Sequence, residues 1–134
     1  MSVHHEQLTV RSDARLDTVD ITGRVRAAVT RSKIRDGMCV VASTHTTAAV
    51  FLNENADPDV RRDLLAKLAA LVPRDDEFRH AEGNADAHIK AVLVGNDVTL
   101  PVRDGELVLG TWQGIFLAEF DGPRERHAIV TIVG

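Results

Sequence analysis

The last third of the chain decides the fold, and from Val98 to Val133 it reads VTLPVRDGELVLGTWQGIFLAEFDGPRERHAIVTIV. Within it, the pair Asp104-Gly105 separates the runs Val98 to Val102 and Glu106 to Leu109. Both residues of the pair tolerate the positive φ that a tight hairpin turn requires, so a β-hairpin is predicted. Two further strands are predicted over Thr111 to Asp121 and Arg126 to Val133. This part of the chain is therefore expected to be antiparallel sheet.

Helices alternate with short strands in the preceding part of the sequence. Asp57 can cap a helix that begins at Pro58 and ends at Pro73, with an apolar stripe of Val60, Leu64, Leu68 and Leu71. A second helix is expected from near Asp20, with Gly37 as its stop, and a third from Ala85 to Leu93, where a strand is the alternative. Short strands are expected at Glu6 to Arg11, Met38 to Ser43 and Ala48 to Asn53. Residues 1–134 are thus predicted to form a single α+β domain with two or three helices against a largely antiparallel sheet.

Composition narrows the classes of function. The 134 residues are 44% hydrophobic and 27% charged, as in an ordinary soluble domain, and no apolar run is long enough to cross a bilayer. The first residues, Met1 to Arg11, are too polar for a secretory signal, so a cytoplasmic protein without membrane contact is expected. The net charge of -4 disfavours nucleic acid as a partner. The single Cys39 stands in an apolar run, which predicts a small buried side chain.

Three histidines are candidates for a metal site because they stand among small polar residues. His45 lies in Ser43 to Thr47, and His80 and His88 bracket Ala81 to Ala87. Neutral imidazole is a preferred zinc ligand. A helix that begins at Asn84 would let His80 and His88 point at one spot, and His45 could complete the set. The alternative is that all three are hydrogen-bonded loop histidines.

The predicted strand Thr111 to Asp121 places a carboxylate among aliphatic side chains. Period-two alternation puts Glu119 on one face with Ile115 and Leu117, and Trp112, Phe116 and Phe120 on the other face as core. A carboxylate in that setting is either paired, with Arg124 or Arg126 as the near partners, or held for chemistry or a metal. Both alternatives stay open from the sequence.

A phosphate could be held where the third helix begins. Gly83 and Asn84 precede the first free amides of that helix, and Lys90 and Arg124 could add positive charge. Surface solvation is the alternative for both cations.

Five stretches together resemble a known family. They are Thr44 to Ala49 (THTTAA), Asn53 to Pro58 (NENADP), His80 to Lys90 (HAEGNADAHIK), Leu109 to Gln113 (LGTWQ) and Glu119 to Arg124 (EFDGPR). In order and spacing they are similar to the YjbQ family, whose members are described as secondary thiamine-phosphate synthases. The resemblance covers nearly the whole chain. It implies an α+β fold around a twisted antiparallel sheet and a homotrimer with sites near subunit boundaries.

The resemblance also implies a reaction that joins a hydroxymethylpyrimidine diphosphate to a thiazole phosphate and releases diphosphate. Zinc is expected at His45, His80 and His88, and magnesium would suit the diphosphate substrate. We expect Glu54, Glu82 and Glu119 to be catalytic, and Thr46, Asn84, Lys90, Gln113 and Arg124 to bind substrate. Two alternatives are a metal-dependent hydrolase, in which a glutamate helps a metal to activate water, and a trimer that binds a metal or metabolite without turnover.

Overall fold

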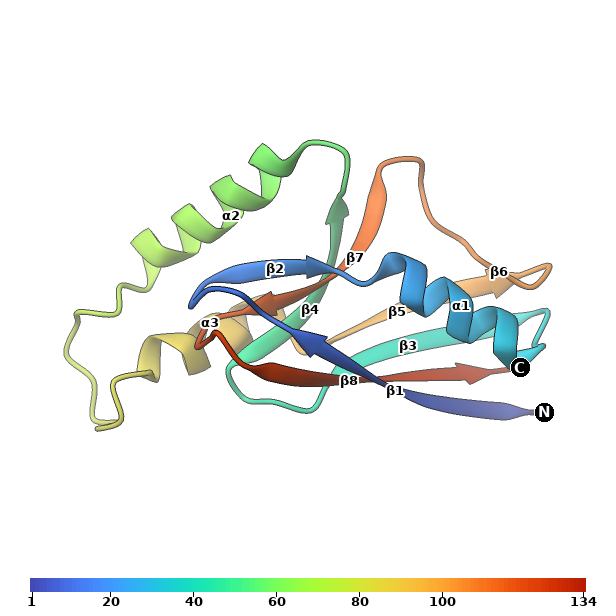
Figure 1. Ribbon diagram of the computed structural model, residues 1–134, viewed down its shortest axis with the longest axis horizontal. Coiled ribbons are helices and arrows are strands. Elements are labelled where there is room, and N and C mark those ends of the chain that lie inside the picture. The colour runs from blue at the N-terminus through green and yellow to red at the C-terminus, as the bar shows by residue number, and fades with distance from the viewer.

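Two antiparallel sheets form the frame of the molecule (Figure 1). The computed structural model describes residues 1–134. The five-stranded sheet has the order β1 (Val3–Arg11), β8 (Glu125–Val133), β3 (Gly37–Ser43), β5 (Asp97–Arg103) and β6 (Glu106–Leu107). The three-stranded sheet has the order β2 (Asp17–Asp20), β7 (Gln113–Glu119) and β4 (Ala48–Glu54). The helices are α1 (Thr22–Ser32), α2 (Pro58–Leu71) and α3 (Ala85–Val94). The predicted α+β architecture is confirmed, with three helices.

The three-stranded sheet is apolar on both faces because a hydrophobic core lies on each side of it. The larger core joins this sheet to the five-stranded sheet and to α1, and includes Val25, Cys39 and Leu117. The smaller core joins its other face to α2 and α3, and includes Phe116 and Ala91. The layers are therefore sheet, sheet and helices, and the outer face of the five-stranded sheet carries no helix.

Strand β7 confirms the predicted alternation, with one exception. Ile115 and Leu117 enter the larger core, while Phe116 and Phe120 enter the smaller one. The prediction that Trp112 is core is wrong, since its side chain is 63% exposed. The strand begins at Gln113, so Trp112 lies in the preceding loop, where the alternation no longer applies.

Helix α2 begins as predicted but buries little of its stripe. The Asp57 carboxylate accepts a hydrogen bond from the Asp59 amide over 2.9 Å, which is the expected cap ahead of Pro58. Only Leu68 of the stripe is buried, and Leu71 is 64% exposed. In Figure 1, α2 stands at an angle away from the sheets, so one turn of it carries most of the packing.

Of the two glycines predicted to end a helix, one does so and the other does not. Gly95, with φ of 96°, ends α3 as predicted, and a helix rather than a strand precedes it. Gly37 is not the stop of α1, because Lys33 already ends that helix in the left-handed conformation. Gly37 begins β3, where an added Cβ would lie 1.9 Å from the carbonyl oxygen of Val133. Glycine is needed there for the close approach of two strands.

The hairpin turn is confirmed at Asp104 and Gly105, whose φ values are 55° and 81°. Cys39 is confirmed as a buried side chain, and burial raises the pKa of its thiol to about 11. None of the helices has the length and apolar character needed to span a membrane.

Candidate functional site

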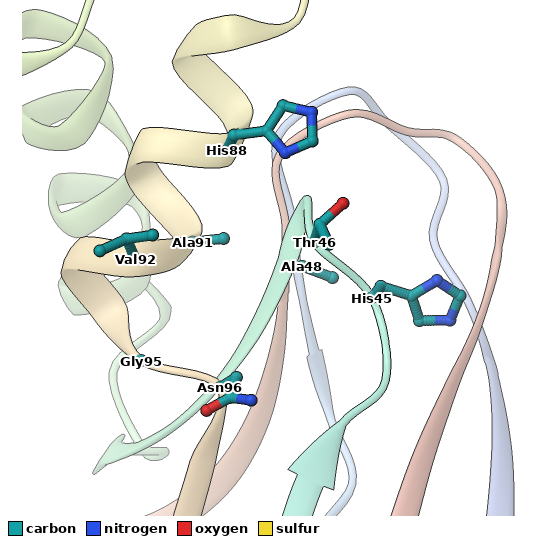
Figure 2. Close-up of a pocket in the computed structure, with 8 residues that line it drawn as sticks. All are labelled: His45, Thr46, Ala48, His88, Ala91, Val92, Gly95 and Asn96. Carbon is teal, nitrogen blue, oxygen red and sulfur yellow. The ribbon is translucent and has the colours of Figure 1, made fainter.

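A cavity of about 510 Å³ opens between α3 and the segment that connects β3 to β4 (Figure 2). Its polar lining consists of His45 and Thr46 from that segment, His88 from α3, and Asn96 from the turn that follows α3. The remaining lining residues are small or apolar: Ala48, Ala91, Val92 and Gly95. The lining therefore contains no carboxylate, lysine or arginine.

A second cavity, of about 390 Å³, lies at the other end of the same helix. It is lined by Phe78, Arg79, His80, Ala85, His88 and Ile89. His88 thus lines both cavities. Arg79 is exposed and makes no ion pair or side-chain hydrogen bond within the chain. The first cavity therefore has no Asp, Glu, Lys or Arg in its lining. The second cavity includes the guanidinium group of Arg79, which is not paired with any other side chain of the protein.

The ring of His45 is held in place by the last strand. Its Nε2 accepts a hydrogen bond from the backbone amide of His127 over 2.8 Å, and the two rings stack with centroids 5.7 Å apart. Burial lowers the pKa of His45, and the positive charges of Arg126 and His127 lower it further, while Glu119 opposes them. His45 is therefore held as a neutral imidazole near pH 7.

The other two histidines meet each other. The rings of His80 and His88 make an edge-to-face contact with centroids 5.2 Å apart. His80 Nε2 lies 3.0 Å from Asn84 Oδ1 and 3.6 Å from a carboxylate oxygen of Glu82. The expected pairing of His80 and His88 near the start of α3 is thus present, whereas the Nε2 of His45 is engaged by His127.

The expected zinc site requires three or more ligand side chains to converge on one point. No group of three or more His, Cys, Asp or Glu side chains is gathered so that it could hold a metal ion. A three-histidine centre therefore does not fit the side chains of one chain, and zinc stays a prediction.

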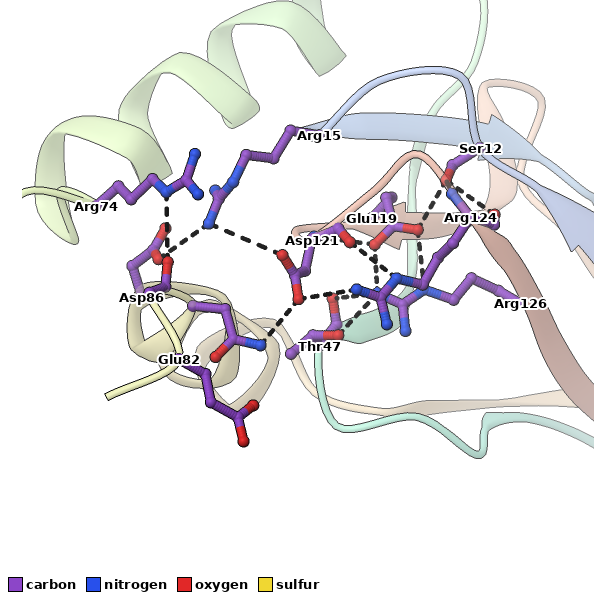
Figure 3. Close-up of polar contacts among 12 residues, drawn as sticks. Ser12, Arg15, Thr47, Arg74, Glu82, Asp86, Glu119, Asp121, Arg124 and Arg126 are labelled. Atoms are coloured by element: carbon purple, nitrogen blue, oxygen red, sulfur yellow. Dashed lines mark hydrogen bonds and ion pairs between the residues drawn. The ribbon is translucent and has the colours of Figure 1, made fainter. Parts of the chain in front are cut away.

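Glu119 is the structural member of an ion pair (Figure 3). Its carboxylate is fully buried and accepts hydrogen bonds from Arg126 Nε over 2.8 Å and from the Ser12 hydroxyl over 2.7 Å. Burial alone would raise the pKa of Glu119, but the hydrogen bonds from Arg126, the Asp121 amide and Ser12 hold it below its usual value. Glu119 lines neither cavity. Of the two alternatives, the pair with Arg126 is the one present, and the expected catalytic role of Glu119 stays a prediction.

Lys90 is also committed inside the protein. Its ammonium group is buried and donates to the Asp86 carboxylate over 2.5 Å, and Arg15 reaches the same carboxylate over 3.3 Å. The positive charge expected to contact a phosphate is therefore paired with Asp86 within the chain, and the role of Lys90 toward substrate stays a prediction. The helix spacing of Lys90 from Asp86 explains the pairing, since residues four apart lie on one face.

Arg124 and Asn84 converge on one carboxylate, that of Asp121. Arg124 donates to the Asp121 carboxylate over 3.1 Å and to its carbonyl oxygen over 2.9 Å, and Asn84 Nδ2 donates to the carboxylate over 2.9 Å. The Arg124 side chain stays half exposed. The side chain of Asn84 makes no capping hydrogen bond to α3, so the first amides of that helix keep no side-chain acceptor. Both predicted substrate-binding residues therefore lie at the start of α3.

Two further predicted residues lie far from both cavities within one chain. Glu54 and Gln113 face each other across β4 and β7, at the opposite end of β4 from Ala48. Six residues of extended strand separate Glu54 from Ala48, which corresponds to about 20 Å. Glu54 accepts a hydrogen bond from the Asp57 amide, and Gln113 accepts one from the Gly110 amide. Within one chain, both side chains brace loops.

Sequence reasoning missed Arg79, Asn96 and Asp121 as site residues. Asn96 follows the glycine that ends α3, and a polar residue at that position was a usable signal. Asp121 ends the stretch that carries Glu119, but its contact with Asn84 joins positions 37 residues apart. That contact has no local signature in the sequence.

Comparison with known proteins finds relatives that match nearly the whole chain. A sequence model described as UPF0047 protein YjbQ-like matches residues 6–134. A UPF0047 protein of Methanocaldococcus jannaschii is 49% identical over 125 residues, covering 93% of this chain and 91% of that protein. The UPF0047 protein YugU of Bacillus subtilis is 41% identical over 128 residues, covering 95% of this chain and 97% of that protein.

Solved structures also match over nearly the whole chain. A crystal structure from Sulfolobus solfataricus, of a protein of unknown function, superimposes with a TM-score of 0.96 at 38% identity, covering 99% of this chain and 98% of that one. A conserved protein from Clostridium acetobutylicum gives a TM-score of 0.94 at 45% identity, covering 96% and 99%.

Proposed function

Because the chain belongs to the YjbQ-like UPF0047 family, we propose that it is an enzyme for a small phosphorylated heterocycle, with thiamine-phosphate synthesis as its reaction. The two adjoining cavities that share His88 support this proposal. Small-molecule sites commonly have volumes of about 300–1,000 Å³, with a mostly apolar lining and a few polar groups. The cavity without charged groups suits an uncharged ring, and the one with Arg79 suits a phosphate.

The reaction asks for particular groups. The thiazole nitrogen forms a bond to the methylene carbon of the pyrimidine, while the bond from that carbon to the diphosphate oxygen breaks and diphosphate leaves with the electron pair. Hydrogen-bond donors aimed at the departing oxygen atoms would lower the barrier. The available donors are Arg79, Arg124 and the first amides of α3. Magnesium bound to the diphosphate would enter with the substrate.

The residues of the uncharged cavity would orient the heterocycle. Thr46 and Asn96 can exchange hydrogen bonds with ring nitrogens or an amino group, and Ala91 and Val92 offer apolar contact to the ring face. His88 lies where the two cavities meet and would contact the reacting carbon. A bound substrate would thus extend along α3 from Asn96 toward Arg79.

The test uses purified protein with both substrates and follows thiamine phosphate and released diphosphate. We expect turnover by the wild type and a loss of at least tenfold in kcat/KM for H88A, because His88 borders both cavities. The control is R24A, which removes an exposed side chain of α1 that lines neither cavity and should leave turnover unchanged. Absence of product with wild type, together with failure to complement a strain without thiamine-phosphate synthase, would contradict the proposal.

Hydrolysis of the same substrate class is a second candidate, favoured by the position of Glu82. Its carboxylate lies 3.6 Å from His80 at the rim of the cavity with Arg79, where it could help to activate water. Release of phosphate from the pyrimidine diphosphate without thiazole phosphate, and its loss in E82Q, would favour hydrolysis. Stoichiometric binding without turnover of either kind would favour a metabolite-binding protein.

We also propose that the active form is a homotrimer. Val92 beside the cavity is 81% exposed, and Met38 on the helix-free face of the five-stranded sheet is 56% exposed. Contact with another subunit would cover such surfaces, and it could bring the distant Glu54 and Gln113 of a neighbouring subunit toward the cavity. Sedimentation should give three times the 14.6 kDa of one chain, and a monomer at micromolar concentration would contradict this assembly.

A further inference from the structure

The proton on the ring of His45 can be located from its backbone contact. An amide N–H only donates, so the His45 Nε2 that receives the His127 amide over 2.8 Å must be unprotonated. A flipped ring would place a carbon against that amide. A neutral imidazole carries one ring proton, and in His45 this proton therefore lies on Nδ1. No group of the chain is hydrogen-bonded to Nδ1. His45 is one of the residues that line the uncharged cavity, and Figure 2 shows its ring turned away from α3.

The proton on His80 is located by a short relay of side chains. Asn84 Nδ2 donates to the Asp121 carboxylate over 2.9 Å, which turns the amide oxygen of Asn84 toward His80. Since an amide oxygen only accepts, the His80 Nε2 at 3.0 Å must carry the proton. The Glu82 carboxylate, 3.6 Å from the same nitrogen, favours the same arrangement. The lone pair on Nδ1 of His80 is then free.

The carboxylate of Asp121 is itself held in place by two arginine side chains. Arg124 donates to the oxygen that Asn84 also contacts, and Arg15 lies 4.0 Å from the other oxygen (Figure 3). These contacts fix the position of the carboxylate, so the amide of Asn84 has one favoured orientation.

We propose that the fold sets the tautomers of the two histidines in opposite senses, so that His45 offers a hydrogen-bond donor and His80 a hydrogen-bond acceptor. His45 then binds an acceptor atom of the ligand, such as a ring nitrogen or an oxygen, and is not a metal ligand. The free Nδ1 of His80 is the nitrogen whose lone pair is available to a ligand or to a metal ion. Asp121 is a positioning residue, since it acts through Asn84. The roles toward substrate rest on the proposed function, whereas the tautomers do not.

The tautomers can be read directly by NMR of protein labelled with ¹⁵N-histidine, near pH 8. Two-bond couplings distinguish a protonated ring nitrogen from an unprotonated one, and H45Q and H80Q identify the signals. We expect protonated Nδ1 and bare Nε2 for His45, and the reverse for His80. Finding protonated Nε2 in His45, or protonated Nδ1 in His80, would overturn the inference.

The D121N variant tests the relay. Its own amide can donate as well as accept, so the amide of Asn84 can turn over, and His80 should show averaged ring-nitrogen shifts. His45 should keep its wild-type signals, which also reports that the variant is folded. An unchanged His80 in the folded variant would overturn the positioning role of Asp121.

Titration with zinc alone separates the roles of the two rings. We expect a change at Nδ1 of His80 and none at His45, and loss of the Nδ1 proton of His45 would overturn its role as a donor. Tautomers as proposed in a protein that makes no thiamine phosphate would contradict the proposed function and leave this inference intact.

Discussion

Replacing Arg126 by methionine should cost the protein a large part of its stability. Arg126 and Glu119 are both fully buried, and Arg126 donates to both oxygens of the carboxylate and also to the hydroxyl of Thr47 over 2.7 Å. R126M leaves Glu119 ionised or protonated in an apolar interior, with only Ser12 and the Asp121 amide as donors. Removal of one partner from a buried pair typically costs about 3–5 kcal/mol.

That cost is large beside the total stability of a domain of this size, which is on the order of 5–15 kcal/mol. Urea unfolding followed by circular dichroism measures it as a lower midpoint with an unchanged slope. The variant E119M/R126M is the matched control, because it removes both charges and keeps apolar volume at the site. We expect the double variant to regain most of the loss.

Acid should weaken the wild type through the same pair. The pKa of Glu119 lies below its usual 4.5 in the folded protein, so the unfolded chain binds the proton first as pH falls. The stability that the Glu119 carboxylate contributes is fully present above the pKa of the unfolded chain. It is lost as pH falls through the lower pKa of the folded protein. A loss below about 1 kcal/mol in R126M, or a double variant no more stable than R126M, would refute this reasoning.

Three further predictions concern single positions. The free energy of unfolding of G37A should fall by about 1–3 kcal/mol, because the added Cβ meets the Val133 carbonyl. The control G23A, whose Cβ meets nothing within 4 Å, should keep its stability. Equal denaturation midpoints for the two variants would contradict this. Cys39 should resist iodoacetamide at pH 8 until the protein is unfolded, since burial raises its thiol pKa to about 11, and rapid alkylation of the folded protein would speak against it. Acidification from pH 7 to 5 should destabilise wild type more than H45Q, because the pKa of His45 is lowered from 6.5 in the folded state only, and equal losses would exclude His45 as the cause.

The sequence predicted those features that depend on neighbouring residues. The alternation of Ile115, Phe116 and Leu117 located a strand buried on both faces, and Asp104-Gly105 located the hairpin. The cap at Asp57 and the end of α3 at Gly95 also follow from local chemistry. Each of these patterns is complete within a few residues, so no knowledge of the tertiary fold is needed.

The features that the sequence could not predict depend on strand register and on which surfaces meet. The partner of His45 is His127, 82 residues away, and only the packing of the last strand beside the β3–β4 segment brings them together. The positive charge of Lys90 suits a phosphate ligand, but the position of α3 on the sheet buries this side chain against Asp86. The stripe of α2 predicted a core face, yet Leu68 is its only fully buried residue, and Leu64 is partly buried.

A crystal structure with hydroxymethylpyrimidine diphosphate bound is the most direct measurement of how this protein works. We predict the pyrimidine ring between His45 and His88, with an acceptor atom of the ring at His45 Nδ1, and the diphosphate on Arg79 at the start of α3. Diphosphate bound in the cavity of Thr46 and Asn96, or substrate bound away from both cavities, would contradict this arrangement.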